Sequence, residues 1–342
     1  MKILYAIQGT GNGHITRAKE IVPILRKKAE VDLLISGNEC DIELEYPIKF
    51  KFHGLNFTNG KKGGIDFWKS YKKMNLKRFI KEVKSLSLEE YDLVINDFEP
   101  VSAWAAKLTN TDIVSLSHQN AIINKAVPSY RNHILEKLIL KYYAPSKNKY
   151  GFHFKNYHPS IFLPIIRKKI RETKVSNKGH YTIYLPAYHH DRIAKIVSII
   201  PIVKWHIFSK QTNSLIFKKK ITIYPINEFD FIKSMSSSNG ILCGAGFETP
   251  SEALFLRKKL LVIPMKNQYE QKCNALALEK MGVTVLKKLN KKSLHKIIGW
   301  LQTEPIKNIE YKDSTEDIIE FILLPYYNKK VIPTNLLQSF LN

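Results

Sequence analysis

Residues 243–254 read Cys243-Gly244-Ala245-Gly246-Phe247-Glu248-Thr249-Pro250-Ser251-Glu252-Ala253-Leu254. The apolar run Gly240 to Cys243 is typical of the end of a buried parallel strand. Gly244 and Gly246 allow the backbone to turn sharply and to approach a ligand closely. The segment Thr249 to Glu252 then predicts the start of a helix, whose free N–H groups and positive dipole end suit a phosphate. The stretch therefore predicts a strand, a glycine turn and a helix, with an anion site at the turn.

A second pattern follows this helix. Pro264 closes the apolar strand Leu260 to Ile263, and a polar loop then leads into a helix through Asn267-Gln268-Tyr269-Glu270-Gln271-Lys272-Cys273-Asn274-Ala275. This part of the chain resembles the donor half of GT-B glycosyltransferases. The resemblance lies in three motifs, in this order: Gly-Ala-Gly-Phe-Glu-Thr-Pro-Ser-Glu-Ala, Ile-Pro-Met and Glu-Gln-x-x-Asn-Ala-x-x-Leu-Glu-x-x-Gly. It is most similar to the branch of the peptidoglycan UDP-N-acetylglucosamine transferase and the UDP-glycosyltransferases. The match runs from Gly240 to Gly282, and acceptor identity does not follow from it.

The resemblance implies a fold and a division of the chain. We expect an α/β protein with two doubly wound Rossmann-type domains that face each other across a cleft. Residues 1–165 would bind the acceptor and residues 180–315 the nucleotide-sugar donor, while residues 316–342 would cross back to the first domain. The irregular, proline-containing segment Tyr143 to Lys178 would connect the two domains.

The resemblance also implies donor contacts. Backbone N–H groups at the glycine turn would bind the pyrophosphate, Glu252 the ribose hydroxyls, and Glu270 with Gln271 the sugar. Main chain at Ile226 would contact the base. The alternatives are that Glu252 only complements the helix dipole and that Gln271 only starts a surface helix. The donor residues are Ile226, Gly244, Ala245, Gly246, Phe247, Glu252, Glu270 and Gln271.

The N-terminal segment carries a second glycine turn. Lys2 to Gln8 predicts a buried strand, and Ile15 to Lys28 has the period of an amphipathic helix. Gly9-Thr10-Gly11-Asn12-Gly13-His14 lies between them, where a doubly wound sheet presents its ligand site. His14 stands where a dinucleotide fingerprint needs glycine, which disfavours a nicotinamide site. In the resembling enzymes this loop also ends in histidine, so His14 is a candidate base, with Gly11, Asn12 and Gly13 as acceptor contacts; the alternative is a helix-capping histidine.

Two further strand ends carry polar groups. The strand beginning at Tyr91 ends in Asp97 and Glu99, either of which could orient His14 or act as the base itself. The alternative is that the acid is an N-cap of the next helix. The strand Ile113 to Ser117 brings His118 to the same edge as an acceptor-side candidate. Because no Asp-x-Asp motif follows a suitable strand, we expect no metal ion, and no cofactor is expected.

Length and charge limit the remaining choices. The 342 residues suffice for two domains, and no apolar run reaches the ~18 residues of a membrane span. The short apolar start does not resemble a signal peptide, so we expect a cytoplasmic protein. The net charge of +24 favours polyanionic partners, although a lysine-rich genome explains it equally well. Cationic residues are interleaved with aromatic residues from Lys61 to Lys84, which suits an anionic membrane surface as well as an ordinary solvated helix whose aromatic face packs inward.

Three functions fit these features. The first is inverting, metal-independent transfer of a sugar from a UDP-sugar to a hydroxyl acceptor, which could be lipid-linked. The second is a UDP-sugar 2-epimerase or hydrolase on the same fold, which would act on the donor alone. The third, nucleic-acid binding, ranks last because no recognisable nucleic-acid motif is present.

Overall fold

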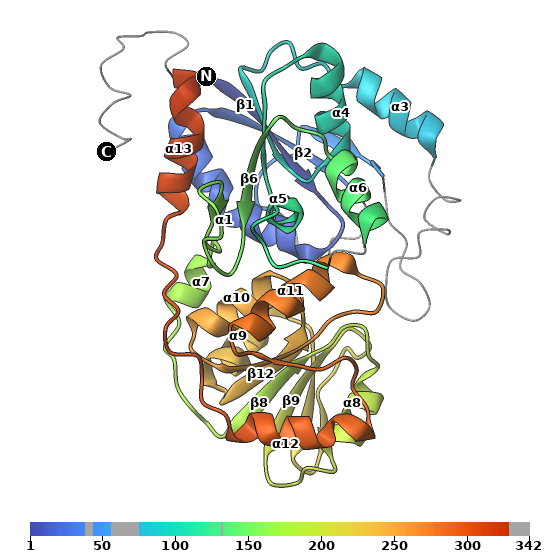
Figure 1. The fold of residues 1–342 in the computed structure, drawn as a ribbon, viewed down its shortest axis with the longest axis vertical. Helices are drawn as coiled ribbons and strands as arrows, with labels where there is room; N and C mark the ends of the chain where they lie inside the picture. Colours follow the sequence, from blue (N-terminus) through green and yellow to red (C-terminus); the bar gives the residue numbers. More distant parts are fainter. Residues whose placement is uncertain (38–43, 56–74, 131–132, 328–342) are drawn as a thin grey trace.

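The computed structural model describes residues 1–37, 44–55, 75–130 and 133–327, and it contains two seven-stranded sheets. Figure 1 shows them in separate halves of the molecule, one above the other. The strand order is β3-β2-β1-β4-β5-β6-β7 in the first sheet, and each neighbouring pair is parallel. Its strands are β1 (Lys2–Gln8), β2 (Glu30–Ser36), β3 (Phe50–Phe52), β4 (Leu93–Asp97), β5 (Ile113–Leu116), β6 (Asn148–Phe152) and β7 (Ile161–Phe162).

The second sheet repeats this arrangement. Its order is β10-β11-β9-β8-β12-β13-β14, and β10 with β11 is the antiparallel pair at one edge. The strands are β8 (His180–Tyr184), β9 (Lys204–Ser209), β10 (Ile216–Lys218), β11 (Ile221–Pro225), β12 (Gly240–Gly244), β13 (Lys259–Ile263) and β14 (Thr284–Val285). The expected pair of doubly wound α/β sheets is confirmed.

Helices cover both sheets. In the first half these are α1 (Asn12–Lys28), α3 (Leu76–Ser85), α4 (Pro100–Thr109), α5 (His118–Ile123), α6 (Ile134–Tyr143) and, after the last strand, α7 (Lys168–Arg171). The second half has α8 (His190–Val197), α9 (Glu228–Ser237), α10 (Glu248–Phe255), α11 (Tyr269–Lys280), the 3-10 turn η1 (Lys291–Ser293) and α12 (Leu294–Gln302). None of the helices in the described ranges is long and apolar enough to cross a membrane.

The chain returns to the first half at its end. Helix α13 (Thr315–Tyr327) packs against α1, although it follows the whole second sheet. The two segments that connect the halves lie beside each other, because Arg171 donates to the carbonyl oxygens of Tyr311 (2.8 Å) and Lys312 (3.1 Å). Tyr311 in turn donates its hydroxyl to the carbonyl oxygen of Phe154 (3.0 Å). The two connections are therefore tied to each other and to the first half.

Two local predictions were wrong. Helix α1 begins at Asn12 rather than Ile15, because Gly11 adopts a positive φ of 87° and completes the turn before it. The segment from Tyr143 to Lys178 is not only a connection, since it contributes β6 and β7 to the edge of the first sheet. Strands of five and two residues, with prolines nearby, produce too little periodicity to be recognised.

Candidate active site

The first glycine turn places two polar side chains on one face of α1. His14 and Arg17 lie three residues apart, so they project from adjacent turns in the same direction. Strand β4 pairs with β1, and Ile7 lies opposite Asp97 at the carboxyl ends of both strands. The order of the sheet reverses between these two strands, which is where doubly wound sheets bind ligands. The chain topology thus brings His14, Arg17 and Asp97 together.

His14 and Asp97 form a hydrogen-bonded pair. The distance from His14 Nδ1 to Asp97 Oδ1 is 2.8 Å, and Asp97 is completely buried. Arg17 donates Nε to Oδ2 of Asp97 (3.0 Å) and Nη2 to both carboxylate oxygens (2.8 Å each). Burial alone would raise the pKa of Asp97, but Arg17 and His14 together hold this pKa below its ordinary value. Because an ionised Asp97 can only accept, the imidazole donates its Nδ1–H, and Nε2 keeps a lone pair.

Glu99 has a different environment. It is the N-cap of α4, and its two carboxylate oxygens accept the backbone N–H groups of Val101 (2.7 Å) and Ser102 (2.6 Å). The side chain is completely buried, and burial raises the pKa of this carboxyl group. This geometry corresponds to the helix-capping alternative for the second acid, and it leaves Asp97 as the acid that touches His14.

The second glycine turn faces the first. Gly244 ends β12, Phe247 is the N-cap residue of α10, and Glu248 begins the helix. Arg17 donates Nη1 to Oε1 of Glu248 (2.7 Å), so a residue of the first half binds the start of α10 in the second half. A Cβ atom on Gly13 would lie 3.4 Å from Cγ of Glu248, which shows how closely the two glycine turns approach. Burial raises the pKa of Glu248 to about 7, against the opposing effect of Arg17.

Glu252 lies one turn further along α10 and has a partner that the sequence did not suggest. Arg167, from the connecting segment, donates Nε to Oε1 (2.5 Å) and Nη2 to Oε2 (2.8 Å) of Glu252. Its Nη1 also donates to Glu228 (2.8 Å). Only 3% of Glu252 is exposed. Both oxygens expected to bind ribose hydroxyls are therefore occupied by a guanidinium group in this structure.

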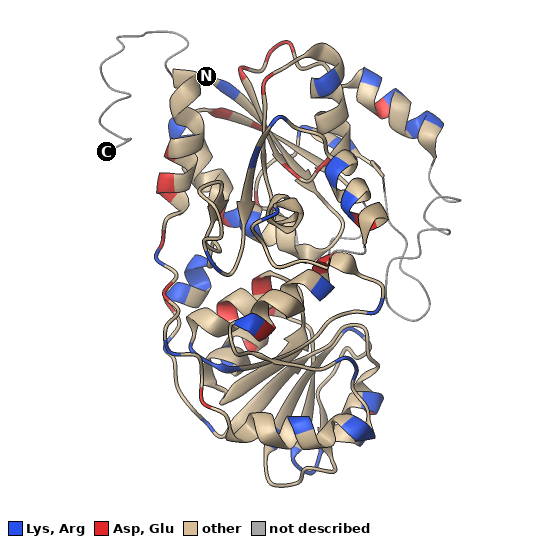
Figure 2. Cartoon of the chain, in the orientation of Figure 1, with Lys and Arg blue, Asp and Glu red and all other residues tan. Residues whose placement is uncertain are grey.

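Helix α11 provides further contacts at the junction, the region where the two halves meet. Glu270 accepts a hydrogen bond from Gln119 of the first half (2.9 Å), while Oε1 of Gln271 accepts the backbone N–H of Met265 (2.9 Å). Asn274 is fully buried and lies 2.9 Å from Nε2 of His118. Figure 2 shows acidic residues on the helices of the second half that lie nearest the first half.

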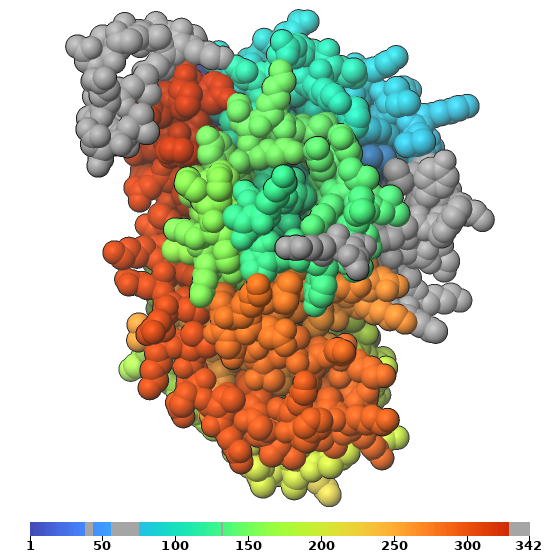
Figure 3. All heavy atoms as spheres, viewed as in Figure 1, coloured from blue at the N-terminus to red at the C-terminus, as the bar shows by residue number. Residues whose placement is uncertain are grey.

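His118 lies at the centre of this junction. Its ring stacks on Phe247, with 4.0 Å between ring centroids and 11° between the planes. Its Nδ1 lies 2.7 Å from the carbonyl oxygen of Phe152, and burial lowers the pKa of the imidazole. Figure 3 shows the green first half and the orange second half in direct contact on this face. His118 thus joins the halves, while the remaining predicted donor residue, Ile226, is exposed directly after β11.

Sequence reasoning missed three residues of this site: Arg17, Glu248 and Arg167. Arg17 had a detectable signal, because it follows His14 by three residues on a predicted helix. Glu248 lay inside the quoted glycine-turn motif, but its partner is 231 residues away. Arg167 had no signal, since it lies in the irregular connection, 85 residues from Glu252.

Comparison with known proteins gives a family and a fold. A family model described as "Glycosyl transferase family 1" matches residues 1–303. No curated protein sequence matches the chain. Among solved structures, MurG of Acinetobacter baumannii is 13% identical, with a TM-score of 0.59, and the match covers 94% of this chain and 99% of that chain.

Two further solved structures are similar over nearly their full length. LpCGTa, in complex with UDP, is 9% identical, with a TM-score of 0.62 and coverage of 95% of this chain and 99% of that chain. SsfS6 of Streptomyces sp. SF2575, complexed with thymidine diphosphate, is 11% identical, with a TM-score of 0.56 and coverage of 95% and 99%. At these identities the similarity establishes the two-sheet fold.

Proposed function

The chain belongs to glycosyl transferase family 1 and is a GT-B glycosyltransferase, and from this premise we propose that it transfers a sugar from a UDP-sugar to a hydroxyl acceptor. The observation that carries the proposal is the hydrogen bond between His14 and buried Asp97, at the glycine turn that faces α10. The reaction we propose is a direct displacement that inverts the anomeric centre and requires no metal ion.

The donor would bind on the second half. The UDP and thymidine diphosphate complexes of the two similar structures support a nucleoside diphosphate as the common part of the donor. Backbone N–H groups from Gly244 to Phe247 and the start of α10 would hold the pyrophosphate, because a helix N-terminus carries free donors and a positive dipole end. Ala245 and Gly246 belong to this turn. Main chain at Ile226, directly after β11, would contact the base.

Glu252 would bind the ribose hydroxyls after Arg167 has moved. The two oxygens that Arg167 occupies are the acceptors that a ribose diol needs. Glu270 and Gln271 begin α11 beside the glycine turn, and a Cβ atom on Gly244 would lie 3.8 Å from Oε1 of Gln271. The sugar hydroxyls would bind to this pair. Binding of the donor would thus replace the hydrogen bonds between Glu252 and Arg167 with hydrogen bonds between Glu252 and the ribose.

The chemical step would use the first half. Nε2 of His14 accepts the proton of the acceptor hydroxyl, and the acceptor oxygen forms a bond to the anomeric carbon. The bond between that carbon and the phosphate oxygen breaks, and UDP leaves with the electron pair. Asp97 holds the imidazole in the tautomer that leaves Nε2 unprotonated and stabilises the imidazolium that forms. Gly11, Asn12, Gly13 and His118 would line the acceptor side.

We also propose that the two halves bind different substrates, as the sequence predicts. Residues 1–165 would carry the acceptor and residues 180–315 the donor, and residues 316–342 would belong with the first unit. The packing of α13 on α1 supports the last assignment over its described part. The irregular segment between the sheets, which contains Arg167, would be the connection that responds to the donor.

A lipid-linked acceptor at an anionic membrane surface is the acceptor class that we propose. The predicted segment Lys61 to Lys84 lies outside the described residues up to position 74. Its described part forms α3, which exposes Leu76 and Ile80 beside Lys77 and Lys81. Exposed apolar side chains among cations can enter a lipid headgroup layer while the ammonium groups bind its phosphates.

Helix α6 of the same half adds a second such face. It exposes 69% of Ile134 and 64% of Leu135, and also Leu138 and Tyr142, with Lys141 on its last turn. A Leu135→Ser, Lys141→Gln double variant should bind less to vesicles that contain phosphatidylglycerol, whereas a Lys291→Gln, Lys292→Gln control in the second half should bind like the parent. Equal binding by both variants would contradict the proposed surface.

One experiment tests the core of the proposal. The parent and His14→Ala are screened by thermal shift against UDP-, TDP- and GDP-sugars, since a ligand at 100 times its Kd stabilises by about 2.7 kcal/mol. We expect UDP-sugars to raise the Tm of both proteins equally, because His14 belongs to the acceptor side. With the stabilising donor, His14→Ala should release UDP about 10²–10⁴-fold more slowly. A parent that is not stabilised by any nucleotide sugar would refute the donor assignment.

A further inference from the structure

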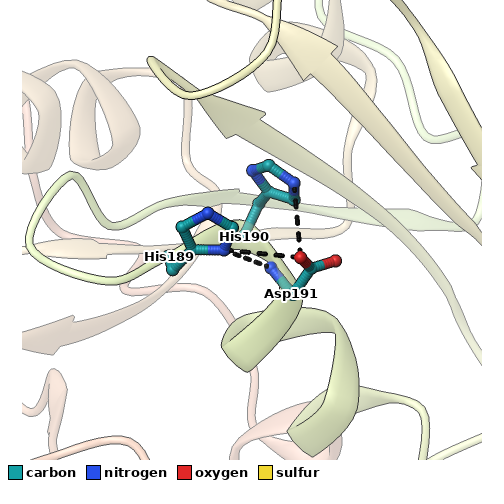
Figure 4. Close-up of side chains that lie close together, drawn as sticks. All are labelled: His189, His190 and Asp191. Carbon is teal, nitrogen blue, oxygen red and sulfur yellow. Dashed lines mark hydrogen bonds and ion pairs between the residues drawn. The ribbon is translucent and has the colours of Figure 1, made fainter.

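A cluster of three ligand-type side chains lies outside the proposed reaction site. His189, His190 and Asp191 occupy the N-terminal turn of α8, and one ligand atom from each lies within 4.8 Å of the other two. The distance to Asp191 Oδ2 is 3.5 Å from Nδ1 of His189 and 3.9 Å from Nε2 of His190. Figure 4 shows both rings turned toward the same carboxylate. Among the described residues this is the group with the spacing of a metal site.

Hydrogen bonds outside the cluster fix the tautomer of His190. The hydroxyl of Ser209 donates to Oε1 of Gln211 (3.1 Å), so its proton is already used. Nδ1 of His190 lies 3.1 Å from the same hydroxyl oxygen. The ring must therefore donate its Nδ1–H to Ser209, and a neutral ring then has a lone pair on Nε2, the atom nearest to Asp191.

His189 has its lone pair on Nδ1, where it caps the helix. Its Nδ1 accepts the backbone N–H of Asp191 at 3.3 Å, as the N-cap of α8. Nδ1 is therefore unprotonated, and the ring proton lies on Nε2. Three ligand-type atoms, from two imidazoles and one carboxylate, thus lie close together, and a metal ion would replace the backbone N–H of Asp191 as the partner of Nδ1 of His189.

We propose that His189, His190 and Asp191 bind a divalent transition-metal ion, with zinc as the best fit. Zinc lies about 2.0–2.2 Å from imidazole nitrogen and carboxylate oxygen, which places tetrahedral ligands about 3.4 Å apart. The two separations measured to Asp191 are 3.5 and 3.9 Å, and all three ligand atoms lie within 4.8 Å of one another, so the side chains would draw together around the ion. Imidazole with carboxylate is a donor set that suits zinc, and two histidines select against magnesium and calcium. A water molecule would complete the four ligands.

The neighbouring groups complete the site. Ser209 accepts a hydrogen bond from Nδ1 of His190 and so fixes the orientation of the ring. Histidines that bind metals generally have such a hydrogen-bond partner on their other ring nitrogen. Lys218 donates to the other oxygen of Asp191, Oδ1, at 2.9 Å, so it leaves Oδ2 available but competes for the same negative charge. The ion would link the three residues at the start of α8 to one another, while Ser209 at the end of β9 holds the ring of His190. Its role is structural and independent of the proposed sugar transfer.

Zinc titration of the tag-free protein by calorimetry tests the site. We expect one zinc ion per chain, a higher Tm with zinc and reversal by EDTA. Asp191→Asn and His190→Ala should abolish this binding, and Ser209→Ala should weaken it about 10–100-fold. Lys218→Met should strengthen it, because a competing cation is removed. His295→Ala, an exposed histidine of α12, is the matched control and should bind like the parent.

Two outcomes would overturn the proposal. One is a parent protein that binds no zinc at millimolar concentration. The other is zinc binding that survives in both Asp191→Asn and His190→Ala, which would place the ion elsewhere. Asp191 is exposed and its replacement by asparagine is isosteric, so this variant should remain folded, as circular dichroism would verify.

Discussion

Asp97→Asn separates the structural from the catalytic contribution of the buried carboxylate. Asp97 accepts three hydrogen bonds from Arg17 and one from His14, and it has no contact with solvent. The amide has the same shape but a single acceptor oxygen and no charge. If that oxygen remains at the Oδ2 position, it keeps two bonds from Arg17, and the new NH₂ group faces Nδ1 of His14. The imidazole must then accept at Nδ1 and carry its proton on Nε2, so it can no longer act as a base.

The magnitudes follow from these contacts. Removing one partner of a buried ion pair costs about 3–5 kcal/mol, and we expect the lower end because Arg17 keeps Glu248 at 2.7 Å. This corresponds to a fall in Tm of about 5–10 °C. Loss of a positioned general base should slow turnover about 10²–10⁴-fold. Donor affinity should stay unchanged, because the donor residues lie on the other half.

The assay is UDP release at saturating donor, measured well below the Tm of the variant, with an acceptor or with water as the acceptor. Glu99→Gln is the matched control, since Glu99 is equally buried but only caps α4. It should lose stability and keep most of its turnover. If Asp97→Asn loses stability as expected but keeps turnover within about threefold of the parent, then His14 does not need its partner, and the proposed base is wrong.

Further predictions concern the carboxylates of α10 and their partners. Glu252→Ala should weaken UDP binding by ~1–3 kcal/mol, whereas Gln271→Ala should weaken binding of the intact UDP-sugar but not of UDP. Calorimetry with UDP and with the UDP-sugar measures both effects. Affinities equal to those of the parent would contradict the prediction. Arg167→Met should lower the Tm but tighten UDP binding, because the side chain that competes for Glu252 is removed. Weaker UDP binding would instead mean that Arg167 itself contacts the sugar donor. The pKa of Glu248 is raised to about 7 in the folded state, so the folded protein binds a proton that the unfolded chain has already lost, and stability should fall as pH rises from about 4.5 to 7. Glu248→Gln should flatten this dependence of Tm on pH. An unchanged dependence would refute the raised pKa.

Much of the fold could be predicted because its signals are local. The apolar runs of β1 and β12, the glycines after them and the periodic helices each occupy one short stretch of consecutive residues. The same rule placed His14 and Asp97 at one edge, since parallel strands present their carboxyl ends together. The structure brings these two side chains to 2.8 Å, while their catalytic roles remain proposals.

The remainder depends on contacts between distant segments. No local pattern indicates that Arg167 will bind Glu252 or that Arg17 will bind Glu248, because charged residues pair according to the packing of the two halves. The sequence could not distinguish Asp97 from Glu99 either. Asp97 ends β4 and Glu99 lies two residues further on, and only the direction of each side chain decides which one caps a helix and which one meets His14.

The paired connections between the halves would restrict how the two sheets can move relative to each other. Arg171 ties both crossings together through Tyr311 and Lys312, and both lie along one side of the molecule in Figure 1. A rotation of one sheet relative to the other would therefore pivot at that side. The opposite side, where Tyr269 donates to the carbonyl oxygen of Tyr130 (3.3 Å), would then separate furthest. Substrates would enter there, while the ion pair between Arg167 and Glu252 lies near the pivot and would part only when the donor takes its place.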